Sequence, residues 1–116
     1  MPNDSSTSVV IKFADPERIG RAVTEFARAL REKHPEVQRI IWFGSWVNGI
    51  PTPGSDVDIC LILSQSGLRF RDRISQYLPS GFPVGLDLFP YTEEEFTALA
   101  EGSPSWHRCM ASGRDV

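Results

Sequence analysis

The 116-residue sequence contains only two cysteines and two histidines. Cys60 and Cys109 are too few and too far apart to form a disulfide framework or a cysteine-based zinc site. His34 and His107 are isolated from each other along the chain, which argues against a histidine-based metal site. These absences exclude the disulfide-rich and zinc-dependent classes, so any metal site is expected to use oxygen ligands.

The chain also lacks an excess of basic charge and a long hydrophobic run. Its 12 basic and 15 acidic residues give a formal net charge of -3, which argues against binding nucleic acid by bulk charge. No apolar run approaches the roughly 20 residues that a membrane span needs. The N-terminal segment MPNDSSTS does not have the basic-then-apolar order of a signal peptide. We therefore expect a cytoplasmic protein without membrane contact, with residues 1–8 as a flexible polar tail.

The length predicts a single domain over residues 1–116. Asp15 is a suitable N-cap and Pro16 a suitable first residue for a helix, which His34-Pro35 would end. Between them, apolar residues recur at helical spacing. The apolar segment 8–13 is expected to be an edge strand.

Three further strands and three helices are expected downstream. The strands are predicted at 37–43, 57–63 and 84–89, and a short helix at 68–78. Thr92 and Glu95 form a capping-box pattern that predicts a helix ending at Gly102, followed by a last short helix after Ser103. The alternation of strands and helices indicates an α/β or α+β domain, with three or four strands in one mixed sheet flanked by helices.

Three aspartates stand at or near the predicted strands. Asp56 and Asp58 are two residues apart at the start of the second strand, so their side chains are expected on one face. Asp87 adds a third carboxylate from another apolar strand, and Gly85 two residues earlier is expected to leave open space on the same face. Three oxygen donors without nearby His or Cys match Mg²⁺ or Mn²⁺. Carboxylates that bridge two such ions are typical of phosphoryl and nucleotidyl transfer.

The Gly44-Ser45 pair follows the first predicted strand directly. Glycine allows close approach of the backbone, and serine offers a hydroxyl group, so the pair is suited to hold phosphate beside the acids. Taken one at a time, these features also have simpler interpretations. The Gly-Ser pair is typical of a turn, SDVD of a capped loop, Trp42 and Trp46 of packing, and Arg69, Arg71 and Arg73 of a solvated helix face. Taken together, three acids on two apolar strands favour a catalytic site.

The segment GSWVNGIPTPGSDVDI resembles the G-S-x10-D-x-D signature of the DNA polymerase beta nucleotidyltransferase superfamily. Within it, the chain most resembles the minimal nucleotidyltransferases, and the resemblance covers nearly the whole sequence. It implies a small mixed sheet, two Mg²⁺ ions held by Asp56, Asp58 and Asp87, and phosphates held at Gly44 and Ser45. Asn48, Gly49 and Ser55 lie in the same segment and are expected to complete the nucleotide site. The family transfers a nucleoside monophosphate, commonly AMP from ATP, to a hydroxyl group and releases pyrophosphate.

The chain departs from the family pattern at Asn48. A basic residue often precedes the second glycine of the signature, whereas here Asn48 precedes Gly49. Asparagine can donate a hydrogen bond but carries no positive charge. Weaker triphosphate binding is therefore expected, unless an arginine elsewhere in the chain supplies the charge.

Three functions are compatible with this resemblance. The leading hypothesis is a protein adenylyltransferase that acts as the antitoxin of a toxin-antitoxin pair, because similar minimal nucleotidyltransferases modify a helical partner toxin. The second is an antibiotic-type transferase acting on a small hydroxylated molecule, with a homodimer supplying the missing wall of the site. The third is a catalytically weak binding module that neutralises its partner by docking.

Overall fold

The computed structural model describes residues 15–51 and 55–116, so the expected tail at 1–8 and edge strand at 8–13 lie outside the described residues. In chain order the described elements are α2 (Pro16–Lys33), β1 (Val37–Phe43), α3 (Ser45–Asn48), β2 (Val57–Leu63), α4 (Phe70–Tyr77), β3 (Leu86–Thr92), α5 (Glu93–Gly102), α6 (Pro104–Ala111) and β4 (Arg114–Asp115). None of these helices is long and apolar enough to cross a membrane.

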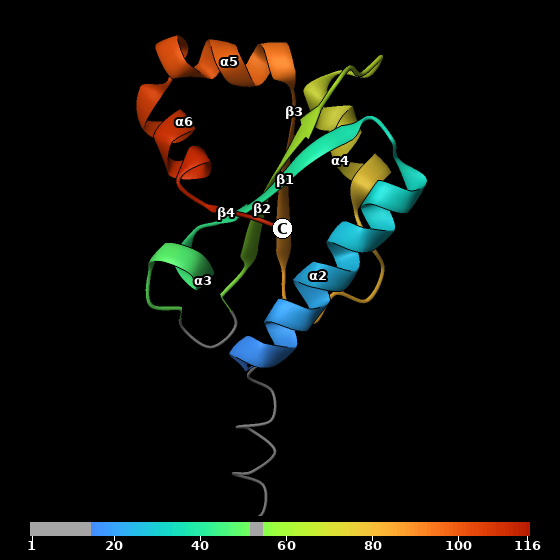
Figure 1. The fold of residues 1–116 in the computed structure, drawn as a ribbon, viewed down its shortest axis with the longest axis vertical. Helices are drawn as coiled ribbons and strands as arrows, with labels where there is room; N and C mark the ends of the chain where they lie inside the picture. Colours follow the sequence, from blue (N-terminus) through green and yellow to red (C-terminus); the bar gives the residue numbers. More distant parts are fainter. Residues whose placement is uncertain (1–14, 52–54) are drawn as a thin grey trace, which may run out of the picture.

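The strands form one four-stranded mixed sheet in the order β3-β2-β1-β4, which confirms the predicted fold class (Figure 1). β1 runs antiparallel to β2 and β4, and β2 runs parallel to β3. The two parallel strands therefore begin at the same end of the sheet, where β1 finishes.

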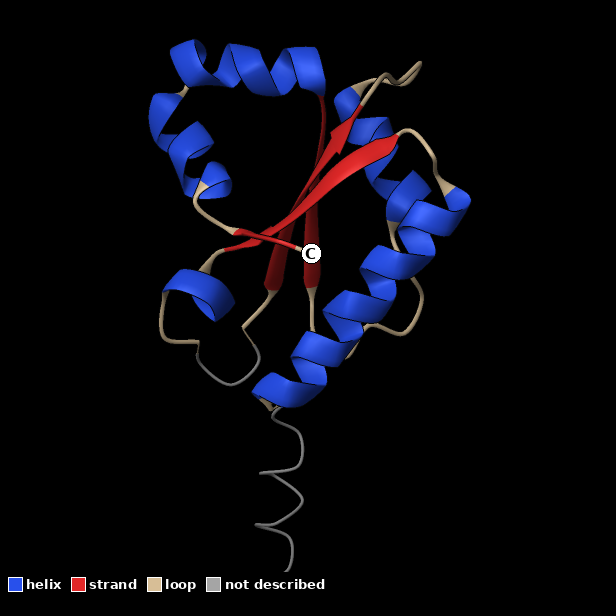
Figure 2. Cartoon of the chain, in the orientation of Figure 1, coloured by secondary structure: helices blue, strands red, loops and turns tan. Residues whose placement is uncertain are grey.

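Helices cover both faces of the sheet (Figure 2). On one face, the buried residues of α2 pack with Trp42 of β1 and with the odd-numbered residues of β2. On the other, Ile41, Phe43 and Cys60 pack with residues of α5 and α6. The alternation of side chains along each strand thus separates two cores, one against α2 and one against α5 and α6.

The helix starts follow from local chemistry, as predicted. The Asp15 side chain accepts a hydrogen bond from the backbone N–H of Arg18, 2.8 Å away, and Pro16 opens α2. Thr92 and Glu95 form the reciprocal capping box at the start of α5. Each cap satisfies backbone donors that the first helical turn leaves unpaired.

The third strand differs from its predicted bounds. It spans Leu86–Thr92 instead of 84–89 and pairs with β2 as far as Leu63. The strand runs through Pro90, which a central strand would not tolerate, because β3 is an edge strand of the described sheet. The Pro90 carbonyl accepts a hydrogen bond from Arg73 of α4 at 3.0 Å, so its outer edge is covered by a side chain.

The prediction of a solvated arginine face on α4 is wrong for Arg73. Its side chain is only 5% exposed and forms a two-pronged ion pair with Glu95, at 2.6 and 3.1 Å. Arg69 and Arg71 are exposed, as expected. Arg73 thus ties α4 to β3 and α5, which is a tertiary contact that helical spacing alone does not reveal.

Candidate active site

The site is built where the two parallel strands begin. Asp58 of β2 and Asp87 of β3 are register partners on neighbouring strands, and Asp58 also pairs with Phe43 at the end of β1. Strands lie about 4.8 Å apart, and in-register residues of parallel strands point to one face. The sheet therefore brings together two of the three predicted acids, on the face that α5 and α6 cover.

The third acid, Asp56, lies against Gly85 of the segment before β3. A Cβ atom built on Gly85 would lie 2.2 Å from an Asp56 carboxylate oxygen, and the Gly85 carbonyl accepts a hydrogen bond from the Val57 N–H at 2.9 Å. The space that we expected Gly85 to leave open is therefore occupied by the Asp56 side chain. Asp56 itself lies just before β2 and is exposed. Gly85 was thus missed as a site residue, although its position two residues before Asp87 was a usable signal.

Gly44 makes a comparable close contact with Asp58. Its φ of 92° lies in the left-handed region, which favours glycine. A Cβ atom there would lie 2.3 Å from the Asp58 Oδ2 atom. The glycine of the signature is therefore required both by the backbone turn and by the carboxylate beside it.

The three acids influence one another. Partial burial, followed by the negative charges of Asp87 and Asp56, raises the pKa of Asp58 above its ordinary value. Asp58 is half-buried, whereas Asp87 is exposed. The strand ends thus concentrate negative charge that a cation would relieve.

The remaining residues of the signature lie around the short helix α3. Ser45 begins α3, and Gly44 provides its N-cap, with the Gly44 carbonyl accepting from the backbone N–H of Asn48 at 2.9 Å. The Asn48 side chain donates to the Ser112 hydroxyl at 3.4 Å, so it faces the segment after α6. Gly49 is the C-cap of α3, with its N–H bonded to the Ser45 carbonyl.

Trp46 ties α3 to the second half of the signature. Its indole Nε1 donates to the Ser55 carbonyl at 2.9 Å. This bond places Ser55, the residue before Asp56, next to α3. Four of the five predicted nucleotide-binding residues therefore belong to α3 and its caps, and the fifth, Ser55, is bonded to that helix through Trp46.

The donor set suits a divalent ion that binds together with a substrate. In the part of the chain that the structure describes, no three Asp, Glu, His or Cys side chains are close enough together to hold a metal ion by themselves. Mg²⁺ usually binds through one or two carboxylates together with substrate phosphates, and does not need an all-protein cage. The adjacent carboxylates of Asp58 and Asp87, with Asp56 beside them, fit that mode of binding.

Known nucleotidyltransferases resemble this chain in sequence and in fold. The family model of the nucleotidyltransferase domain matches residues 23–109. The fold is similar to the crystal structure of a presumed nucleotidyltransferase from Sulfolobus solfataricus, with a TM-score of 0.58 and 21% identity over 72% of this chain and 75% of that chain. No curated protein matches the sequence. The matched span includes Gly44, Asp58 and Asp87, and the chain belongs to the nucleotidyltransferase domain family.

Proposed function

We propose that this nucleotidyltransferase moves AMP from ATP to a hydroxyl group of a protein partner, in a Mg²⁺-dependent reaction. The observation that carries the proposal is the register of Asp58 with Asp87, with Gly44 held against the Asp58 carboxylate. Membership of the family supports a nucleotide substrate and a transferase activity. The protein acceptor, the adenine nucleotide and Mg²⁺ go beyond what family membership supports, and they are part of the proposal.

Asp56, Asp58 and Asp87 are the proposed ligands of two Mg²⁺ ions. Such ions, when bound, neutralise charge on the triphosphate and lower the pKa of the acceptor hydroxyl. Burial raises the pKa of Asp58, and repulsion from Asp87 and Asp56 raises it further, which supports this role because a bound cation would offset both effects.

The phosphates are proposed to bind against Gly44 and Ser45. Gly44 has no side chain to block a phosphate, and the Ser45 hydroxyl can donate a hydrogen bond. Asn48, Gly49 and Ser55 complete the nucleotide site. Because Asn48 donates to Ser112 and carries no charge, we expect it to contribute less than a basic residue would.

In the proposed reaction, the acceptor oxygen attacks the α-phosphorus of ATP. The new P–O bond forms as the bond between the α-phosphorus and the bridging oxygen breaks, and pyrophosphate leaves with that electron pair. The Asp87 carboxylate is the proposed acceptor of the hydroxyl proton, and its exposure supports that role. Asp56 and Asp58 are proposed to act as metal ligands throughout.

The acceptor is proposed to be a helical toxin-like protein, with this chain acting as its antitoxin. The described helices are engaged in covering the two faces of the sheet. The exposure of Asp56 and Asp87 supports an acceptor that approaches from outside the chain.

The experiment is copurification with the candidate partner, followed by intact-mass measurement with and without ATP and Mg²⁺. We expect the partner to gain the mass of one AMP, and the Asp58→Asn variant to leave it unmodified. A bound but unmodified partner would favour the docking module instead. Transfer only to a small hydroxylated compound would favour the antibiotic-type enzyme.

A further inference from the structure

A second polar site lies on the opposite face of the sheet from the acids. An open groove of about 610 Å³ runs between the N-terminal half of α2 and the end of β4. It is lined by Glu17, Gly20, Arg21, Thr24, Glu25, Trp42, Arg114 and Val116. Trp42 packs in the core against α2, whereas its neighbour Phe43, the register partner of Asp58, packs in the core against α5 and α6. The groove and the acidic site are therefore separate.

Trp42, which lines the groove, carries a buried hydrogen-bond donor that no described residue satisfies. Trp42 is only 6% exposed, and its indole Nε1 has no hydrogen-bond partner among the described residues. The other two indoles do have partners, because Trp46 donates to Ser55 and Trp106 donates to the Tyr91 hydroxyl at 2.9 Å. A buried polar group without a partner is uncommon, because it lowers the stability of the fold. We therefore expect the Trp42 N–H to bind an acceptor that is not among the described residues.

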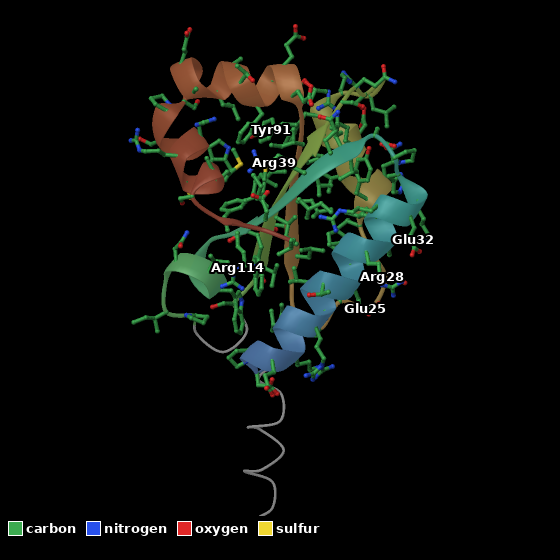
Figure 3. The ribbon with its side chains drawn as sticks, viewed as in Figure 1. Glu25, Arg28, Glu32, Arg39, Tyr91 and Arg114 are labelled. Carbon is green, nitrogen blue, oxygen red and sulfur yellow. The ribbon has the colours of Figure 1, made fainter. Side chains whose placement is uncertain are left out.

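Two guanidinium groups stand beside this donor. Arg114 pairs with Trp42 in register and places its guanidinium carbon 5.5 Å from the centre of the Trp42 ring. Arg21 lines the groove from α2, and neither arginine forms an ion pair with a described residue. Figure 3 shows Arg114 near the end of the sheet, and Glu25 and Arg28 along α2.

The acids of the groove do not neutralise both arginines. Glu25 is paired with Arg28, which also pairs with Glu32 at 3.4 Å. Glu17, in the first turn of α2, is the remaining acid of the lining. Two arginines without an ion pair to a described residue thus line a hollow of the size that small molecules occupy, and the buried Trp42 indole N–H lies beside it.

We propose that this groove binds a small oxyanion ligand, carried on a carboxylate or a phosphate group. An anionic oxygen would accept from the Trp42 indole N–H, while Arg21 and Arg114 supply charge-assisted hydrogen bonds. The ligand would approach on the α2 face, so its binding is independent of the proposed nucleotidyl transfer.

The test uses the three indole N–H signals of the full chain in nitrogen-15 correlated NMR spectra. The protein is titrated with sodium phosphate and, separately, with sodium glutarate, against sodium chloride at equal ionic strength. We expect a saturable downfield shift of the Trp42 indole proton, while the signals of Trp46 and Trp106 stay in place because their partners are internal. A shift with phosphate alone identifies a phosphate ligand, and a shift with glutarate alone identifies a carboxylate ligand.

Variants separate a specific site from general charge effects. Arg21→Gln and Arg114→Gln should each weaken binding about tenfold, the scale of one charged hydrogen bond. Glu17→Gln should tighten it, whereas Arg71→Gln, an exposed arginine outside the groove lining, should leave it unchanged. The absence of a saturable Trp42 shift with either anion would overturn the proposal. An equal weakening by Arg71→Gln, or equal movement of all three indole signals, would overturn it as well.

Discussion

Asp58 is the most enclosed of the three acids, and its charge is opposed by its surroundings. Partial burial and the neighbouring charges of Asp87 and Asp56 both raise its pKa. When no cation is present, ionised Asp58 therefore lowers the stability of the fold at pH values above the ordinary carboxyl pKa. This destabilisation disappears on acidification, when the carboxyl is protonated in both the folded and the unfolded state.

The first prediction is that Asp58→Asn abolishes transfer without harming the fold. We expect the rate to fall at least about 100-fold, the scale of losing one preorganised electrostatic group. In EDTA at neutral pH, the melting temperature should equal or exceed that of the wild type, because one of three repelling charges is gone. Asp72→Asn, in an exposed surface pair with Arg69, is the control. Transfer by Asp58→Asn at the wild-type rate would contradict the metal assignment.

The second prediction concerns Gly44, where backbone conformation and carboxylate contact coincide. Gly44→Ala places a Cβ atom against Asp58 and forces alanine into positive φ, so we expect a loss of about 1–3 kcal/mol in unfolding free energy and weaker nucleotide binding. Gly81→Ala is the matched control, because Gly81 has a φ of 76° but nothing within 4 Å of its built Cβ. Denaturant unfolding and nucleotide titration on both variants measure the two effects. Equal nucleotide affinity in the two variants would show that the Asp58 contact does not matter for binding.

Among single residues, the sequence supports a proposal about chemistry but does not reveal tertiary contacts. The residue types and their spacing were enough to propose Asp58 and Gly44 as site residues, and that role stays a prediction. The role of Gly85 was not predicted, since its contact is with Asp56 on a preceding segment and depends on the register between β2 and β3. Arg73 was misjudged for the same reason, because its partner Glu95 lies 22 residues away.

The elements α4, β3 and α5 are joined by the Arg73–Glu95 ion pair. Hydrogen bonds from Arg73 lower the pKa of Glu95 to about 2, with a further contribution from the backbone N–H of Thr92. A carboxyl whose folded pKa is depressed stabilises the protein above its unfolded pKa, near 4.5. That contribution is lost as the pH falls from about 5 toward 2.

The third prediction follows for Glu95→Gln. The amide oxygen of the introduced glutamine can still accept from the Thr92 N–H, whereas its amide nitrogen cannot accept from Arg73. The change therefore keeps the cap and removes the charge and one of the two bonds to Arg73. We expect a loss of about 1–2 kcal/mol at pH 7, less than the full pKa shift implies, because the Glu95 side chain is 43% exposed and solvent screens it. The difference from the wild type should shrink as the pH falls below about 5 and become small by about pH 2. Urea unfolding across this pH range measures it, and a constant difference at every pH would contradict the ion-pair origin.

For helices and strands, features set by nearby residues were predicted correctly, whereas features that depend on tertiary contacts were not. The caps at Asp15 and Thr92 depend on hydrogen bonds between residues within four positions of each other, and both helices begin as predicted. The bounds of β3 depend on how far β2 extends beside it to form hydrogen bonds. β3 can include Pro90 because it is at the edge of the described sheet. The two-residue strand β4 carries no apolar alternation and exists because it pairs with Ile41 and Trp42.

Across the whole molecule, the site exists only when the sheet is assembled. Gly44 follows β1, Asp58 lies on β2 and Asp87 on β3, so three separate strands must pair in register before the acids and the glycine meet. The unfolded chain lacks this arrangement. Any ligand that needs it should therefore stabilise the native state by mass action.

The last prediction is that ATP with Mg²⁺ raises the melting temperature, whereas either component alone raises it less. At a ligand concentration of 100 times Kd, the gain is about 2.7 kcal/mol, or roughly 10 °C or more for a domain of this size. Asp58→Asn should lose most of this shift. Asp87→Asn should keep it, because Asp56, Asp58 and the Gly44-Ser45 turn still hold the nucleotide, while single-turnover transfer collapses for want of the proton acceptor. If Asp87→Asn instead lost the thermal shift and kept its turnover, Asp87 would be a ligand for the nucleotide-bound metal, and the proton of the acceptor would leave by another group.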